Sequence, residues 1–390
     1  MREAYIVESV RTPGCKNKRG KFKDTRPEDL LSFILKACVD KAGINPAEID
    51  DVMVGCAFPE AEQGINIGRI AGQMAGFPDS VCGATVNRFC SSGIEAIALA
   101  SLRIQAGWSE VTMGAGIESM TFVPMGGNKP RPHPEFSAAD PTAYISMGIT
   151  AENVASRYNI SRQDCDEFAA KSNEKAANAQ KNGYFTEIVP TPAVKFVPQA
   201  DGTFKKESFI VSEDDGVRPG TTAEGISKLS SPFKFGGVAT AANSSQTTDG
   251  AAATLVASKE ACDRLGLKPI AKIVAYAVAG CKSDEMGVGP KYAIPKALKI
   301  AGLKIEDIDA FELNEAFATQ ALHCVRELGI NPDKVNLNGG AIALGHPLGC
   351  TGAKLTATLL GVLKRTGGKY GIVSMCIGGG MGAAAIFEMV

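Results

Sequence analysis

The chain has 390 residues, of which 45% are hydrophobic and 21% are charged, and its formal net charge at pH 7 is −1. This length allows two or three domains with a large buried core. The near-neutral charge gives no reason to expect nucleic acid or an anionic membrane as the main partner, and no run of about 18 apolar residues predicts insertion into a membrane.

The ends of the chain and its cysteines indicate a compartment. A strand pattern begins at Ala4 without an apolar signal segment before it, and no obvious address tag precedes Val390, so we expect a cytoplasmic protein. The eleven cysteines include no C-x-x-C pair, which argues against a zinc site or a disulfide framework and favours reduced thiols.

The first predicted elements lead to a cysteine at a strand-to-helix turn. Helical spacing over 29–39 is followed by a strand ending near residue 86 and by a second helix over 94–103. Cys90 lies between these last two, within the motif Asn87-Arg88-Phe89-Cys90-Ser91-Ser92-Gly93. Free N–H groups and the helix dipole at such a turn favour an anion, so we expect a thiol pushed toward the thiolate. The alternative is a small buried cysteine that packs under the helix.

A phrase near the start of the chain recurs near its end. Residues 42–52 resemble residues 301–311, and the strand pattern over 111–114 has a counterpart over 372–375. Positions matched at one spacing (302 − 43 = 259) are Gly43 with Gly302, Ile49 with Ile308, and Ser92-Gly93 with Thr351-Gly352. Four matched elements in the same order predict two α/β halves related by duplication.

The stretch 121–243 between the halves has a different character. Prolines and glycines precede helices predicted around 147–158 and 162–182, the second with Ser161 as its N-cap and Gly183 just beyond its end. We interpret this stretch as an inserted, loop-rich lid. Its polar second part carries lysines and an arginine, which could hold a phosphate-bearing ligand, although a solvated charged loop is the default interpretation.

Three glycine-rich or polar stretches in the second half exceed what core packing requires. They are Asn314–Ala318, Asn338–Gly352 and Cys376–Gly382. His346 is the obvious base because it lies in a glycine-rich loop, whereas His323 lies inside a predicted helix and His133 in the proline-rich insert. His346 could instead be a hydrogen-bonded structural histidine, and Cys376 a buried packing cysteine. Residues 378–380 could form a phosphate cradle, although they match neither the G-x-G-x-x-G nor the P-loop pattern.

The Cys90 turn and these three stretches together resemble the thiolase family, over essentially the whole chain. The resemblance implies an α/β thiolase fold of two duplicated βαβαβαββ halves, stacked as five α/β/α/β/α layers, with a lid inserted in the first half. We therefore expect a first half of residues 1–120 plus 244–268, an inserted lid of residues 121–243, and a second half of residues 269–390.

The resemblance also implies roles for individual residues. Cys90 is expected to be the nucleophile that becomes acylated, His346 the base that takes its proton, and Cys376 the acid/base that exchanges a proton with the acetyl-CoA carbon. Asn314 is expected to hold a water that stabilises the enolate oxygen together with His346. The N–H groups of Cys90 and Gly378 are expected to stabilise the thioester oxyanion.

These roles fit cleavage of a carbon–carbon bond in a 3-ketoacyl-CoA. The site must stabilise an enolate with fixed donors and then protonate its carbon. The acyl fragment waits on sulfur as a thioester that CoA can attack, which predicts ping-pong kinetics. CoA and acyl-CoA are substrates here, so no metal or bound cofactor is expected.

The lid favours one subclass of the family. Residues 118–128 and 144–155 resemble degradative 3-ketoacyl-CoA thiolases of fatty-acid β-oxidation, and we find no Met-His pair of the biosynthetic type. Arg218 and Ser245 match positions that touch CoA in relatives, although Gly225 replaces a serine usual among biosynthetic relatives, and Met286 lies in a loop expected to line the acyl pocket. The alternatives are a biosynthetic acetoacetyl-CoA thiolase and a catalytically silent acyl-CoA-binding relative, which would lack one of the three catalytic residues.

The family also suggests partners. Relatives are dimers or tetramers, so we expect a homodimer or homotetramer, together with a possible multienzyme partner of β-oxidation. No nucleic-acid partner is expected.

Overall fold

The computed structural model describes residues 2–390, and the first half of the chain builds one part of a large mixed sheet. The strands on its main path are β1 (Ala4–Arg11), β3 (Asp51–Gly55), β4 (Cys82–Val86), β5 (Val111–Ser119) and β8 (Thr248–Ser258). Their order is β4-β3-β5-β8-β1, with β3 parallel to β4 and β5, and β8 antiparallel to β5 and β1. Every residue of β3, β5 and β8 is buried, as expected for a sheet that helices cover on both faces.

The second half repeats this arrangement. Its strands are β9 (Ala271–Gly280), β10 (Ala310–Leu313), β11 (Tyr370–Ile377) and β12 (Met381–Met389). Their order is β10-β11-β12-β9, with β10 parallel to β11, and β12 antiparallel to β11 and β9. In place of a strand equivalent to β4, Val335 forms a single parallel bridge with Phe311. The matching order confirms the predicted duplication, and a short β1–β9 pairing joins the two halves.

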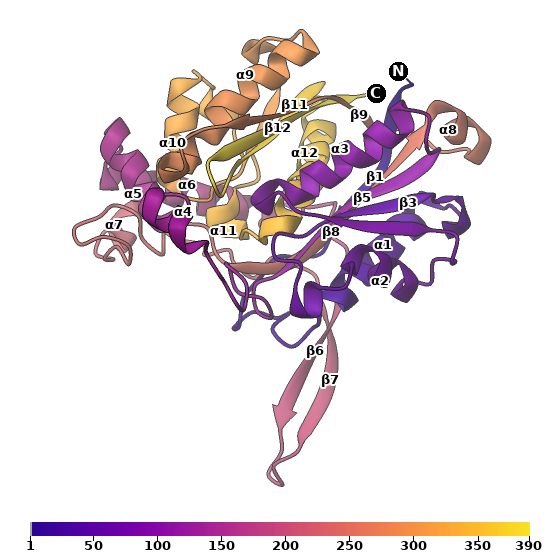
Figure 1. Cartoon of the computed structure of the whole chain (residues 1–390), viewed down its shortest axis with the longest axis horizontal. Helices are drawn as coiled ribbons and strands as arrows, with labels where there is room; N and C mark the ends of the chain where they lie inside the picture. Colours follow the sequence, from indigo (N-terminus) through magenta and orange to yellow (C-terminus); the bar gives the residue numbers. More distant parts are fainter. Residues whose placement is uncertain (1) are drawn as a thin grey trace.

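Helices complete five layers around the two halves of the sheet (Figure 1). They are α1 (Pro27–Ala42) and α2 (Ile67–Met74) on the first half, α3 (Ser92–Gln105) and α12 (Thr351–Thr366) in the middle, and α9 (Gly289–Ala301) and α10 (Ala318–Glu327) on the second half. The middle helices contact each other, while α3 also contacts β5 and α12 contacts β11. The start of each middle helix is therefore placed at the junction of the two halves.

Glycines at equivalent positions allow this close junction. A Cβ on Gly93 would lie 2.6 Å from the backbone nitrogen of Ala353, and a Cβ on Gly352 would lie 2.2 Å from that of Ile94. Either contact is shorter than real Cβ atoms make, so any side chain would push the two helices apart. The Ser92-Gly93 and Thr351-Gly352 pairs that reveal the repeat in the sequence thus mark where α3 and α12 touch.

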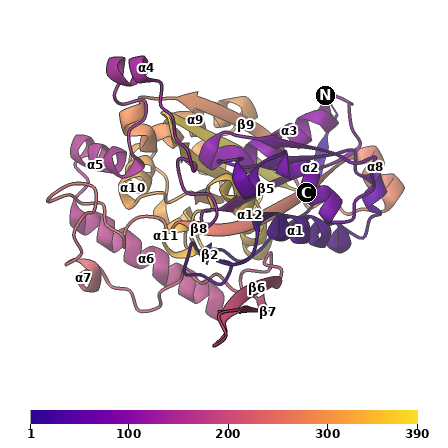
Figure 2. The same cartoon turned by 60° about the horizontal axis from the view of Figure 1, so that its bottom comes forward.

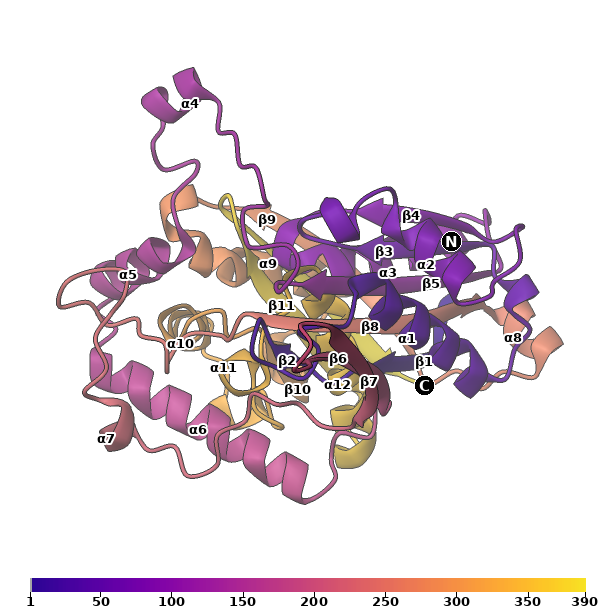
Figure 3. The same cartoon turned by 90° about the horizontal axis from the view of Figure 1, so that it is seen from below.

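The insert connects β5 to β8, which are neighbours in the sheet. It contains α4 (Pro134–Ala139), α5 (Met147–Tyr158), α6 (Arg162–Lys181), the two-stranded sheet of β6 (Thr191–Pro198) and β7 (Phe204–Val211), and α7 (Ala223–Ile226). Ser161 and Asp164 form the capping box of α6, as the sequence indicates. The β6–β7 hairpin projects away from the rest of the chain, α6 runs beside α11, and α4 stands on an arm (Figures 1, 2 and 3). The domain boundaries given above stay a prediction.

The remaining elements are short. They are β2 (Cys15–Lys16), α8 (Lys259–Leu265), α11 (Ala341–Leu344) and 3-10 turns that include Phe89–Ser91 and Leu348–Cys350. Among residues 2–390, none of the helices combines the length and apolar character needed to cross a membrane.

Candidate active site

Polar side chains hold Cys90 on a strained turn between β4 and α3. Phe89 has a φ of +43°, in the left-handed region that is unfavourable for a residue with a side chain. The Asn87 Oδ1 atom accepts a hydrogen bond from the Phe89 N–H at 2.8 Å. The Ser92 hydroxyl accepts one from the Arg88 N–H at 2.8 Å and donates one to the Phe89 carbonyl at 2.7 Å. The motif around Cys90 therefore encodes the conformation of this turn.

The turn places Cys90 against segments of the second half. It contacts both β11 and the Leu348–Cys350 turn. Cys90 packs against the small apolar cluster of Ala57, Met120 and Leu348, and the last of these is two residues beyond His346. The histidine loop and the cysteine turn thus meet where α3 and α12 begin.

Cys376 and Gly378 reach the same place from the end of β11. The Gly378 N–H faces the Cys90 thiol and lowers its pKa. Burial raises the pKa of the Cys376 thiol well above its usual value, and the charge of the nearby Cys90 raises it further. The structure therefore brings together the two thiols and the backbone donor, and Cys376 is a neutral thiol that can give up a proton.

The Cys90 thiol itself is not activated in the free protein. Burial raises its pKa to about 12, and the N–H groups of Gly378 and Cys90 only partly oppose this effect. The expectation of a thiolate at this turn is therefore wrong for the resting site, because loss of hydration outweighs the helix N-terminus. A thiol in this state needs a base before it can act as the nucleophile expected from the sequence.

His346 has the tautomer and the protonation state of such a base. Its Nδ1 atom lies 2.5 Å from the Thr351 Oγ1 atom, and the Thr351 hydroxyl donates its single proton to the Pro347 carbonyl at 3.0 Å. The Thr351 oxygen must then accept from Nδ1–H, which leaves Nε2 unprotonated and facing the Asn314 Nδ2 atom at 3.4 Å. Burial, followed by the charge of Lys354, lowers the pKa of His346 to about 3, so the imidazole is neutral at physiological pH.

Asn314 has one free hydrogen-bonding position beside the imidazole. The residue is buried and its N–H is fixed by the Ser374 carbonyl at 2.9 Å. Its Oδ1 atom is buried without a partner among the described residues. A buried amide oxygen of this kind suits a bound water or a polar group of a ligand.

An apolar cluster adjoins Cys376 and includes part of the lid. Its buried members are Ala151, Ala239, Met286, Ala316, Phe317 and Cys376. The half-buried Met147, at the start of α5, packs against the cluster, and its sulfur would lie 3.7 Å from a Cβ placed on Gly378. Met286 therefore lies beside the site, and the lid contributes one wall.

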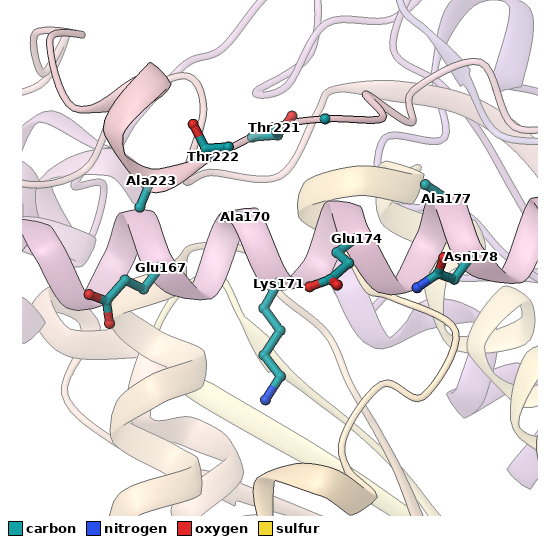
Figure 4. A pocket seen from close by; sticks show the side chains of 10 residues that line it. Glu167, Ala170, Lys171, Glu174, Ala177, Asn178, Thr221, Thr222 and Ala223 are labelled. Atoms are coloured by element: carbon teal, nitrogen blue, oxygen red, sulfur yellow. The ribbon is translucent and has the colours of Figure 1, made fainter.

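The two residues matched to CoA contacts lie at different distances from this centre. Ser245 is half-buried, and its N–H donates to the Ala316 carbonyl at 2.9 Å, within the segment that carries Asn314. Arg218 is exposed in the lid, and its carbonyl accepts a hydrogen bond from Thr221 at 2.8 Å. Thr221 borders a cavity of about 590 Å³ between α6 and residues 220–223. Figure 4 shows the side chains that line it from the helix and from the loop. None of Cys90, His346 and Cys376 lines this cavity.

Sequence reasoning missed several buried polar residues that support the site. The Glu118 carboxylate accepts hydrogen bonds from the Ala57 N–H at 2.8 Å and the Gly349 N–H at 2.7 Å, so it ties β5 to both loops near Cys90. Thr351 orients His346, and Lys354 lies one turn further along α12. Two sequence signals could have indicated these supporting residues. One is a single carboxylate near the end of an apolar strand, and the other is a polar residue on the buried face of a helix.

Replacing Thr351 with valine should slow acylation of Cys90 by about 10- to 100-fold, because Nδ1–H loses its acceptor and the imidazole loses its fixed tautomer. Single-turnover kinetics with the acyl-CoA substrate expected from the sequence measures this rate. Thr356→Val is the matched control, since Thr356 is also buried in α12 but bonds only to the Gly352 carbonyl. Equal slowing in both variants would mean that Thr351 acts only through the stability of the helix.

The sequence also matches two family models along almost its whole length. They are the thiolase N-terminal domain over residues 4–260 and the thiolase C-terminal domain over residues 267–389. The chain belongs to the thiolase family. Among thiolases it is 49% identical to a 3-ketoacyl-CoA thiolase of Bacillus subtilis (strain 168), with 100% of both chains covered.

Solved thiolase structures share this fold. The Bacillus anthracis acetyl-CoA acetyltransferase has a TM-score of 0.90 and 37% identity, covering 100% of this chain and 99% of its own. The dimeric peroxisomal thiolase of Saccharomyces cerevisiae has a TM-score of 0.89 and 40% identity, covering 100% and 98%. Both similarities extend over the lid as well as the two halves, so the thiolase fold is that of the entire described chain.

Proposed function

We propose that this thiolase is an acetyl-CoA C-acyltransferase, which cleaves 3-ketoacyl-CoA with CoA to give acetyl-CoA and a shortened acyl-CoA. The proposal is supported by three groups carried on segments that meet at the junction of the halves. They are the Cys90 thiol facing the Gly378 N–H, the neutral Cys376 thiol beside it, and the unprotonated Nε2 of His346. The 49% identity to a protein named 3-ketoacyl-CoA thiolase supports the same direction of reaction.

In the first half-reaction, Cys90 attacks the 3-keto carbon as its proton passes to Nε2 of His346. The N–H groups of Cys90 and Gly378 stabilise the resulting oxyanion. When the oxyanion collapses, the bond between C2 and C3 breaks, the acyl group stays on Cys90, and acetyl-CoA leaves as its enolate. Asn314, through a water, and the protonated His346 stabilise the enolate oxygen, while Cys376 gives its proton to the enolate carbon.

In the second half-reaction, CoA attacks the Cys90 thioester and its thiol proton passes to the Cys376 thiolate. The tetrahedral intermediate releases the Cys90 sulfur, which takes back the proton held by His346. Each group returns to its starting state. All steps are proton or acyl transfers between the substrates and these side chains, so the proposed cycle uses CoA as a substrate and requires no metal or resident cofactor.

A homodimer is the proposed assembly. β4 lies at the end of the strand order and pairs only with β3, so its outer edge is free among the described residues. The helices α2 and α3, which contact β4, expose large apolar side chains, namely Ile70, Met74 and Leu102. An unpaired edge with apolar neighbours suits pairing with a second copy. The similar yeast thiolase is described as dimeric.

Tetramer formation, a β-oxidation multienzyme partner and the absence of a nucleic-acid partner stay predictions. A cytoplasmic location is also a proposal. It is supported by the 49% identity to the Bacillus subtilis relative.

The degradative assignment predicts a preference for substrates longer than acetoacetyl-CoA. We expect kcat/KM for thiolysis to be at least about 10-fold higher on 3-ketohexadecanoyl-CoA than on acetoacetyl-CoA, because Met286, which is expected to line the acyl pocket, lies in an apolar cluster beside Cys376, and an apolar lining favours longer acyl chains. The rate of 3-ketoacyl-CoA loss in the presence of CoA measures both values. Activity confined to acetoacetyl-CoA would instead support the biosynthetic alternative.

A further inference from the structure

A buried lysine lies directly behind the histidine loop. Lys354 is 4% exposed and lies on α12, one turn after Thr351. Its Nζ atom donates hydrogen bonds to the carbonyl oxygen atoms of Leu344 at 3.1 Å and Gly345 at 3.0 Å. These are the two residues that precede His346, so one side chain of α12 fastens the main chain that carries the imidazole.

The loop depends on such contacts from outside. Gly345 has a φ of +80°, and a Cβ at this position would lie 2.1 Å from the Thr248 Oγ1 atom, so no side chain of its own can anchor it. The His346 N–H donates to the Gln246 carbonyl at 2.9 Å. Lys354 supplies the contacts on the opposite, carbonyl side of the same peptide segment.

The charged and titratable groups around Lys354 do not bind its ammonium group, which is therefore free to bond to the loop. Those that face it are Arg11 in β1, Asp214 after β7, Glu312 in β10 and Cys350 before α12. Asp214 is already engaged by Arg11 through two bonds, of 2.8 and 2.9 Å, and Arg11 also binds Glu187 at 3.0 Å. Among residues 2–390, no carboxylate oxygen lies within 4.0 Å of the Lys354 nitrogen, so its hydrogen bonds go to the loop carbonyls.

Lys354 acts on His346 through its charge as well as through its hydrogen-bond donors. After burial, Lys354 is the group that lowers the pKa of His346. Burial lowers the pKa of Lys354 itself to about 8, while Asp214 and Glu312 oppose this decrease. At neutral pH the lysine is therefore largely protonated, and a positive charge next to the imidazole disfavours a second proton on it.

We propose that Lys354 is a positioning residue for His346: it holds the Leu344 and Gly345 carbonyls, which fixes the loop that carries the imidazole, and its positive charge disfavours a second proton on the ring. The proposal rests on the thiolase chemistry given above. A merely structural lysine would instead contribute only to the stability of α12. A positioning role and a merely structural role predict different rates of Cys90 acylation and different pH dependences of that rate.

Lys354→Met removes the charge and the donors but keeps a long apolar side chain. We expect acylation of Cys90 to slow by about 10- to 100-fold with KM for the 3-ketoacyl-CoA unchanged within about threefold, since Lys354 does not touch substrate. We also expect the acid limb of the acylation rate to move to higher pH by about one unit, because an imidazole without a positive neighbour is protonated more easily. Rapid-quench measurements after a pH jump, between about pH 2.5 and 8, record both effects, because this range includes the acid limb set by the His346 pKa of about 3.

Two further variants separate positioning from stability. Lys354→Arg keeps the charge and donors and should restore most of the rate and the original acid limb. Thr358→Val is the matched control, because Thr358 is buried one turn further along α12 and bonds to Glu187 at 2.9 Å without touching the loop. It should lower Tm but leave acylation and its acid limb unchanged.

The proposal is overturned if Lys354→Met acylates at the wild-type rate with the original acid limb, or if Thr358→Val reproduces its defects. Should Lys354→Met fail to fold, Lys354→Gln retains one amide donor without the charge, and it must still displace the acid limb. A wild-type protein that forms no acyl-enzyme would contradict the proposed function itself and not the placement of Lys354.

Discussion

Replacing Cys90 with alanine should abolish the acyl-enzyme while leaving the fold intact. The sulfur is the group that faces the Gly378 N–H and lies beside Cys376, and alanine offers no atom to carry the acyl group. We expect thiolysis to fall by about 10⁴-fold or more. The turn should persist because Asn87 and Ser92, not Cys90, hold the strained Phe89, so unfolding free energy should change by no more than about 1 kcal/mol. Intact-mass spectrometry after addition of a 3-ketoacyl-CoA tests the loss of the adduct.

Cys90→Ser provides the stricter version of this experiment. The hydroxyl keeps a side chain of similar shape, yet it is a much weaker nucleophile than sulfur and a worse leaving group toward CoA. We expect activity to remain reduced by about 10³-fold or more. An acyl adduct of normal yield in Cys90→Ala, or thiolysis near the wild-type rate in Cys90→Ser, would show that another group carries the acyl chain.

The duplicated core could be predicted because the repeated residues have the same local task in each half. Gly43 and Gly302 end α1 and α9 in the left-handed conformation, with φ of +72° and +67°. Gly93 and Gly352 permit the close approach of α3 and α12. Such requirements are local, so they leave a pattern in the sequence at a constant spacing.

The hairpin β6–β7 and the protonation state of the Cys90 thiol could not be predicted from local sequence patterns. The hairpin projects from the molecule and pairs with no other strand, so much of it is exposed and its apolar pattern is weak. Asp201 and Gly202 at its tip are its clearest turn signal. The high pKa of the Cys90 thiol depends on burial by segments distant in sequence, and the tautomer of His346 depends on Thr351, and neither is a property of the local motif.

Wild-type acylation should be nearly independent of pH across a broad neutral range. The imidazole of His346, with a pKa of about 3, is unprotonated throughout this range, and the Cys90 thiol, with a pKa of about 12, keeps its proton until the base removes it. Between about pH 5 and 7 neither group changes state, and Lys354, with a pKa of about 8, stays largely protonated. The sequence-derived picture of a standing thiolate would give a different result, with its own ionisation visible near neutral pH.

His346→Asn should convert this flat profile into a steep one. Without the base, only the rare Cys90 thiolate can attack, and its fraction increases tenfold for each pH unit below the thiol pKa of about 12. We expect acylation at pH 7 to fall by about 10²- to 10⁴-fold and then to rise about tenfold per unit up to pH 10, as single-turnover kinetics can measure. His323→Asn is the control. His323 lies in α10, where it is buried and stacks on Tyr158 of α5, so this substitution should leave the profile flat. A profile in His346→Asn that stays flat would identify a different base, since only loss of the proton acceptor makes the rate follow the thiolate.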